Sequence, residues 1–159
     1  MVTIRVQQEV FDVGVEIAAL RDGNAKDNPK IGAIASFVGL VRDINDNAGI
    51  ASLTLEHYPG MTEKALAKIV SEAESRWALL GCTVIHRVGT LKPTDQIVLV
   101  IVASSHRGHA FEACEFIMDY LKTDAPFWKK EVTSEGERWV DSRESDAAAA
   151  SRWKEKSAL

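Results

Sequence analysis

The chain has 159 residues, of which 46% are hydrophobic and 26% charged, a composition typical of one globular domain. Its formal net charge of −4 argues against a nucleic-acid or acidic-membrane partner, because both favour basic proteins. The first residues lack the pattern of a signal peptide, and no apolar run approaches the roughly 20 residues that span a bilayer. We therefore expect a cytoplasmic protein in which any anion site is a local concentration of cations.

In the first half of the chain, apolar residues follow the periods of strands and helices. Strict alternation predicts strands over 2–6 and 50–58. A nearly continuous apolar run over 31–41 predicts a central strand covered on both faces. Asp12 can cap a short helix and Thr62 a long one, since both side chains can accept hydrogen bonds from free helix amides.

The second half continues with two strands, a long helix, a hairpin and a last helix, over 82–88, 96–103, 108–123, 128–140 and 145–156. Pro126 ends the long helix because proline cannot continue it. No repeat or linker interrupts the pattern. The sequence therefore predicts a single α+β domain over 1–159, with a mixed or antiparallel sheet and two long helices.

The cysteines and two histidines are interpreted as structural. Cys82 and Cys114 fall in apolar stretches without the spacing of a redox or metal site, so we expect buried free thiols. His57 and His86 lie within predicted strands. The sequence has no Ser-His-Asp order, phosphate-binding glycine loop or metal-ligand spacing, so neither a metal nor a cofactor is predicted.

Lys122 and Lys129 flank Pro126 in an aromatic-rich reversal of the chain. Two lysines near one another and near aromatic rings indicate an anionic ligand, or an amine whose pKa is lowered for chemistry. Two solvated lysines at a helix end fit the same spacing. The spacing alone leaves both interpretations open.

Three further cations are candidates for an anion site. His106 and Arg107 lie at a predicted strand-to-helix junction, where free amide donors and the helix dipole favour negative charge. Arg42 ends the 31–41 strand, and its planar fork suits a phosphate or carboxylate. A capping role for His106 and an ion pair of Arg42 with Asp43 or Asp46 fit these residues equally well.

One distance restricts how these cations can combine. Arg107 and Lys122 are 15 residues apart on one predicted helix, which corresponds to about 22 Å at a rise of about 1.5 Å per residue. They cannot line one small-molecule pocket within a single chain unless the helix breaks. If both serve one site, a second copy of the chain must supply half of it. This predicts a composite site across a homodimer.

Six blocks of the sequence together resemble a known family. They are FVGLVR (37–42), LEHYPGMTE (55–63), VIHR (84–87), SHR (105–107), FIMDYLK (116–122) and APFWK (125–129). The family is the catalytic (large) subunit of molybdopterin synthase, and the likeness covers 31–153, leaving a tail at 154–159. The resemblance implies an α/β hammerhead-type fold. It also implies a dimer of large subunits with a small ubiquitin-like sulfur carrier at each end, which makes a heterotetramer.

The resemblance also implies a sulfurtransferase activity without a cofactor. Two sulfurs would pass in turn from the thiocarboxylate at the carrier's C-terminal Gly-Gly to cyclic pyranopterin monophosphate, forming the dithiolene of molybdopterin. Lys122, beside the carrier's end, and Lys129, beside the pterin, would be catalytic. The positions implied to bind the substrate or support the pocket are Arg42, His106, Arg107, Lys130, Glu131, Phe37, Met118 and Arg143.

Two other classes of function remain open at this point. A different lysine enzyme would form a Schiff base with a carbonyl substrate, and borohydride would trap that substrate on Lys122. A non-catalytic module would only grip the anionic tail of a partner. The presence of both Lys122 and Lys129 disfavours such a module.

Overall fold

The residues that the structure describes, 1–23, 28–45, 48–140 and 144–156 of a computed structural model, form two β-sheets and four α-helices. The first sheet has the order β1 (Val2–Gln7), β5 (Leu79–Arg87), β7 (Gln96–Ser104) and β2 (Ala33–Leu40). In it β1 and β5 are parallel, and the other pairs are antiparallel. The second sheet contains β3 (Ile44–Asn45), β4 (Ala48–His57), β8 (Phe127–Thr133) and β9 (Gly136–Val140), and β6 (Gly89–Leu91) pairs with β4.

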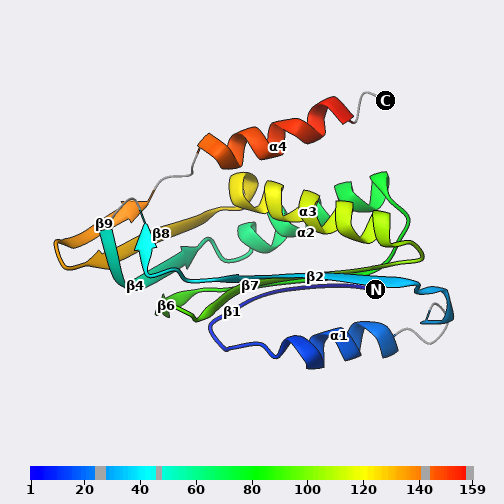
Figure 1. Ribbon diagram of the computed structural model, residues 1–159, viewed down its shortest axis with the longest axis horizontal. Helices are drawn as coiled ribbons and strands as arrows, with labels where there is room; N and C mark the ends of the chain where they lie inside the picture. Colours follow the sequence, from blue (N-terminus) through cyan, green and yellow to red (C-terminus); the bar gives the residue numbers. More distant parts are fainter. Residues whose placement is uncertain (24–27, 46–47, 141–143, 157–159) are drawn as a thin grey trace.

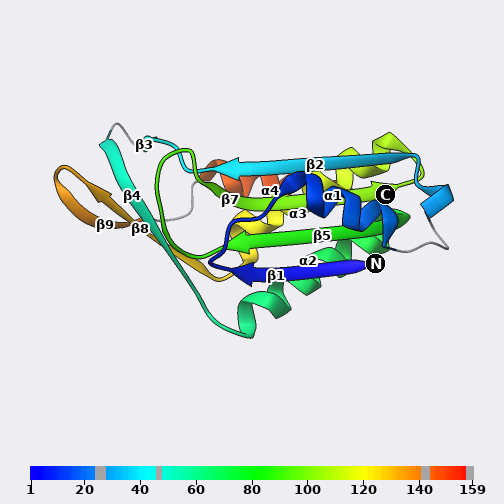
Figure 2. The same cartoon turned by 90° about the horizontal axis from the view of Figure 1, so that it is seen from below.

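Helices cover both faces of the first sheet (Figure 1). One face carries α1 (Val13–Asp22), and the other carries α2 (Met61–Arg76) and α3 (Arg107–Asp124), with α4 (Glu144–Lys156) outside α3. A short 3-10 turn, Asn28–Lys30, precedes β2. Figure 2 shows the second sheet beyond one end of the first. The predicted α+β class with two long helices is confirmed, and no helix among the described residues is long and apolar enough to span a bilayer.

The helix starts confirm one predicted cap and correct the other. Asp12 caps α1, because its Oδ1 accepts a hydrogen bond from the Val15 amide at 2.9 Å. The prediction that Thr62 caps α2 is wrong, since Gly60 holds that position with a φ of 84° that favours glycine. Thr62 is instead fully buried within the first turn of α2. Its hydroxyl donates to the carbonyl of Pro126 at 3.0 Å.

The predicted central strand over 31–41 is an edge strand. β2 pairs with β7 on one side only, so the prediction of its place in the sheet is wrong. Its apolar run arises because helices cover both faces: Ile34 and Val38 pack on the α1 side, and Ala35 packs under α3. A continuous apolar run therefore indicates that both faces of a strand are covered, but it does not indicate how many strands pair with it. The segment between the predicted strands 82–88 and 96–103 contains the short strand β6.

An aromatic cluster fixes α4 on the helical layer. Trp153 of α4 is 1% exposed, and its ring lies 5.6 Å from both Trp77 and Phe116. The indole Nε1 donates to Asp119 Oδ2 at 2.7 Å. Arg76 Nη1 also donates to the Trp153 carbonyl at 2.9 Å. These contacts join α4 to α2 and α3.

The turn between α3 and β8 is held against both the first sheet and α2. Phe127, the first residue of β8, stacks on His86 at the end of β5, with ring centroids 3.8 Å apart and planes inclined by 20°. The bond from Thr62 to Pro126 fixes the same turn from α2. Together these contacts set the position of the last turn of α3 relative to the first residues of β8.

Burial keeps the His86 ring neutral. The side chain is 4% exposed, and desolvation lowers its pKa from about 6.5 to about 3, with a further contribution from the positive charges of Lys122 and Lys129. A hydrogen bond between Nδ1 and the Arg87 carbonyl, at 2.8 Å, acts in the opposite direction. The ring is therefore an uncharged group at the junction of the two sheets.

Trp153→Ala should lower the free energy of unfolding by about 3–5 kcal/mol, because it removes a fully buried ring from an aromatic cluster. Trp139→Ala is the matched control, since Trp139 is 58% exposed on β9, and it should cost less than about 1 kcal/mol. Urea denaturation followed by circular dichroism measures both. Equal losses for the two variants would contradict the assigned packing of α4.

His86→Phe should reduce the loss of folding stability that occurs as the pH falls below 7. The unfolded chain takes up a proton near pH 6.5 and the folded chain only near pH 3, so stability falls as the pH drops through this window. Between pH 7 and pH 5 the wild-type chain should lose about 2 kcal/mol more than the variant, which keeps an aromatic ring but cannot titrate. Denaturation curves at each pH measure the difference. Parallel stability curves for the two chains would show that His86 is not buried as a neutral ring.

Candidate active site

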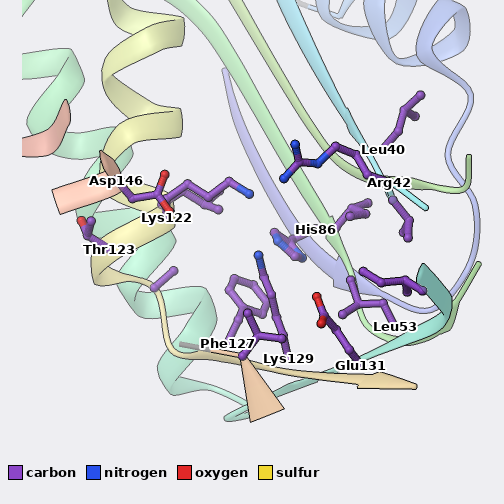
Figure 3. A pocket seen from close by; sticks show the side chains of 16 residues that line it. Leu40, Arg42, Leu53, His86, Lys122, Thr123, Phe127, Lys129, Glu131 and Asp146 are labelled. Carbon is purple, nitrogen blue, oxygen red and sulfur yellow. The ribbon is translucent and has the colours of Figure 1, made fainter. Parts of the chain in front are cut away.

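A recess of about 370 Å³ lies at the junction of the two sheets (Figure 3). Apolar side chains from β4, β7 and β8, among them Leu53, Ile97 and Phe127, form part of its wall. Its polar and charged members are Arg42, His86, Lys122, Thr123, Lys129, Glu131 and Asp146. These residues come from both sheets, the end of α3 and α4, so only the folded chain brings them together.

Lys122 and Lys129 enter this recess from different elements. Lys122 occupies the last turn of α3, and Ala125, the extended residue before Pro126, ends the helix just after it. Lys129 lies on the same face of β8 as Phe127, two residues earlier, which is held against His86. Figure 3 shows both lysine side chains extending into the recess. Lys122 is exposed, but the shared recess favours one anion site over two unrelated lysines.

Arg42 reaches the recess from the opposite wall, just after β2 (Figure 3). The backbone of Val41 fixes its base: the Val41 amide donates to the Asp95 carbonyl at 2.9 Å, and the Thr94 amide donates to the Val41 carbonyl at 2.8 Å. No carboxylate of the described residues forms an ion pair with Arg42. The alternative partner Asp46 lies outside the described residues. Figure 3 shows the guanidinium directed into the recess.

Glu131 is a buried carboxylate on the floor of the recess. It is 2% exposed, and Arg138 of β9 donates to its Oε2 through Nε at 2.8 Å. The strand register places the two residues directly opposite each other. A buried carboxylate needs such a partner because desolvation of an isolated charge is costly. Glu131 therefore supports the wall of the recess together with Arg138.

The alternation of β8 turns Lys130 away from the recess. Lys130 lies on the opposite face of the sheet, where its Nζ is 2.9 Å from Glu137 Oε2 and 5.9 Å from the centre of the Trp139 ring. Lys130 therefore does not line the recess with Arg42, Lys122 and Lys129.

His106 and Arg107 lie at the far end of α3. They occupy the N-cap and the first residue of the helix, both are exposed, and neither lines the recess. α3 has 18 residues, about 27 Å at about 1.5 Å per residue. The helix is unbroken, so one chain does not bring them to Lys122. Arg143, the remaining predicted cation, lies outside the described residues.

Phe37 and Met118 line a second, shallower hollow of about 470 Å³ between β2 and α3. Lys122 and Asp146 border both hollows. Phe37 is 42% exposed, whereas Met118 is buried. The hollow thus continues the recess along the edge of the first sheet.

The cysteines are buried, as predicted, and their thiols are poor nucleophiles. Burial raises the pKa of Cys82 to about 12 and that of Cys114 to about 11. Because the thiolate is the reactive form, neither residue is prepared to carry sulfur. The described residues also contain no group of three or more His, Cys, Asp or Glu side chains that could hold a metal ion.

Sequence reasoning missed the place of His86 in the recess. It shares a strand face with Cys82 and Val84, which pack in the core beneath α2 and α3. A polar ring on an apolar face at the end of a strand was the available signal. His57 keeps its structural interpretation, with Nε2 3.7 Å from Glu63 Oε1.

Comparisons with known proteins point to one family. The family model described as "MoaE protein" matches residues 6–124. A curated relative, the "Molybdopterin synthase catalytic subunit" of Ralstonia nicotianae, is 65% identical over 153 residues, which cover 96% of this chain and 85% of the relative.

Solved structures extend the similarity to three dimensions. The "Molybdopterin biosynthesis MoaE protein" of Burkholderia ambifaria MC40-6 has a TM-score of 0.81 and 58% identity, over 97% of this chain and 99% of that chain. At 21% identity the fold alone is shared with a chain of the "Protein-protein complex of subunit 1 and 2 of Molybdopterin-converting factor" of Helicobacter pylori 26695. That match has a TM-score of 0.70 and covers 88% of this chain and 91% of the other. The family match and the high identity over nearly the whole length show that this chain belongs to the MoaE family of molybdopterin synthase catalytic subunits.

Proposed function

We propose that this chain acts in the cytoplasm as the catalytic subunit of a molybdopterin synthase, with its reaction in the recess between the two sheets. There it exchanges oxygen on cyclic pyranopterin monophosphate for sulfur from a small carrier subunit. The observation that carries the proposal is the convergence of Arg42, Lys122 and Lys129 on one recess (Figure 3). Family membership supports the proposed reaction, and this convergence supports the proposed location of the site.

The charges of the recess suit the two reactants. The substrate phosphate and the carrier's thiocarboxylate are both anions, and the whole chain carries a net charge of −4 that would repel them. Three cations in one recess reverse this locally. At about 4 Å and an effective dielectric constant of about 20, one such contact is worth about 4 kcal/mol before desolvation. The recess therefore concentrates both anions where the exterior does not.

The lysines supply protons to the exchange. In each transfer a carbon of the pterin side chain gains a sulfur and loses an oxygen, while the carrier's thiocarboxylate becomes a carboxylate. The departing oxygen needs a proton, and a positioned amine can give or take one. Lys122 at the end of α3 faces the carrier's terminus, and Lys129 on β8 faces the pterin. The sulfur arrives on the carrier, which fits the inert state of Cys82 and Cys114.

The carrier would present an extended Gly-Gly tail to the recess. Glycines suit a narrow entry because they lack side chains that would meet the walls. The hollow lined by Phe37, Met118 and Lys122 is continuous with the recess through its shared lining and gives the tail an apolar border.

A second copy of this chain would complete the site. His106 and Arg107 lie too far along α3 to serve the Lys122 of their own chain, so we assign them to the recess of the partner in a homodimer. With one carrier for each large subunit the assembly is a heterotetramer. Closed two-fold symmetry then gives each dimer two identical composite sites.

Lys122→Ala and Lys129→Ala should each lower the rate of dithiolene formation by about 10²-fold or more, since each removes an amine that moves protons. The assay uses thiocarboxylated carrier and cyclic pyranopterin monophosphate. Lys68→Ala is the control, because this exposed lysine of α2 is outside the recess, and it should leave the rate unchanged. Normal turnover by either recess variant would remove the proposed function from this site.

Mixing an Arg107→Ala chain with a Lys122→Ala chain should restore activity that neither has alone. Half of the dimers in a random mixture combine both chains, and each then holds one intact composite site, so about a quarter of wild-type activity should return. Mixing Lys122→Ala with Lys129→Ala is the matched control and should restore nothing, because one chain supplies both lysines. The absence of recovery in verified mixed dimers would contradict the composite site.

A further inference from the structure

A carboxylate from α4 lines the recess together with the cations. Asp146 is partly buried and borders both the recess and the neighbouring hollow. Figure 3 shows it on the side of Lys122, across the recess from Arg42. In the described part of the chain no group forms an ion pair or a hydrogen bond with its carboxylate. Glu131, the other acid of the recess, is bonded to Arg138 at 2.8 Å.

A role in the helix explains only part of this position. α4 begins at Glu144, so Asp146 is its third residue. A negative charge in the first turn is favourable, because the helix dipole and the free amides attract it. That role requires an acidic residue at the start of α4, but it does not require the carboxylate to line a recess.

An unpaired carboxylate is unfavourable in a site for anions. The proposed reactants bring a phosphate and a thiocarboxylate into the recess, and like charges repel at such distances. Asp146 therefore weakens the binding of both reactants unless it forms a favourable contact with one of them. Such a contact needs hydrogen-bond donors on the ligand, since a carboxylate can only accept.

The proposed substrate carries these donors at the end opposite its phosphate. The pyrimidine edge of a reduced pterin presents the ring N3–H and the 2-amino group side by side. Two parallel N–H donors match the two oxygens of one carboxylate, as they do in a guanidinium–carboxylate pair. The phosphate at the other end only accepts, and it suits the donors of Arg42. The recess and the substrate thus have matching polarity from end to end.

We propose that Asp146 is a specificity-determining residue, whose carboxylate accepts hydrogen bonds from the pyrimidine edge of the pterin while the phosphate lies toward Arg42. The proposal rests on the proposed function for the identity of the substrate, and it adds the direction in which the substrate lies. The carbons that take up sulfur lie between the two ends of the substrate. This direction therefore brings them to the space that Lys122 and Lys129 enter.

Binding of cyclic pyranopterin monophosphate without the carrier tests this contact. Asp146→Asn loses the charge and one acceptor, so calorimetry should show the dissociation constant raised about 10-fold or more. Inorganic phosphate, which has no pyrimidine edge, should bind the variant at least as tightly as wild type, because a repulsive charge is gone. Asp146→Glu retains the carboxylate and should bind the pterin more tightly than Asp146→Asn.

Glu74→Gln is the matched control, because it makes the same change of charge at an exposed residue of α2 outside both hollows. It should leave the binding of both ligands unchanged. Unchanged or tighter binding of the pterin by Asp146→Asn would show that the carboxylate only repels anions, and would overturn the proposal. Equal weakening of pterin and phosphate binding would also overturn it, because a disturbed recess would then explain the loss.

Kinetics separate this inference from the proposed function. In the dithiolene assay Asp146→Asn should raise KM for the pterin about 10-fold and leave kcat within about threefold, because the pyrimidine edge does not change in the reaction. A wild-type chain that neither binds the pterin nor forms the dithiolene would contradict the proposed function itself. Dithiolene formation by wild type, with KM unchanged in Asp146→Asn, would overturn the role of Asp146 alone.

Discussion

The stack of Phe127 on His86 is the contact on which the arrangement of the site depends. It anchors the start of β8 to the end of β5, while the Thr62 hydroxyl holds the preceding Pro126 from α2. Pro126 ends α3 and the anchored ring begins β8, so the last helical turn and the new strand face one space. Without this junction Lys122 and Lys129 would be two lysines near a chain reversal, as their spacing alone allows.

The same junction explains how an acidic protein can attract anions. Arg42, Lys122 and Lys129 come from three separate elements, and the fold turns all of them inward. Two carboxylates, Glu131 and Asp146, also line the recess, but Glu131 is paired with Arg138, so positive charge is in excess there. The local balance of charge is therefore set by tertiary structure and differs in sign from the total of −4.

Much of the fold, but less of the site, could be predicted from the sequence. Hydrophobic period and local capping chemistry identify α3, β7 and the Asp12 cap, because these depend on neighbours in the chain. The edge position of β2, the pairing of β6 and the burial of Thr62 depend on contacts between distant segments, which periodicity does not encode. The resemblance points to both lysines. For His86, a polar ring on an apolar strand face indicates an unusual position, but what it faces depends on segments distant in the chain. The prediction that Arg107 and Lys122 lie far apart on one helix is confirmed, because the rise of a helix per residue is a local property.

For the proposed reaction, Lys122 and Lys129 must meet the anionic substrate in one recess. Nitrogen-15 NMR of the lysine ammonium groups, during titration with cyclic pyranopterin monophosphate, tests this directly. Both resonances should shift along one saturation curve, while that of Lys68 on α2 stays in place. If either recess lysine is unchanged when the substrate is saturating, the two amines do not share the site and the account fails.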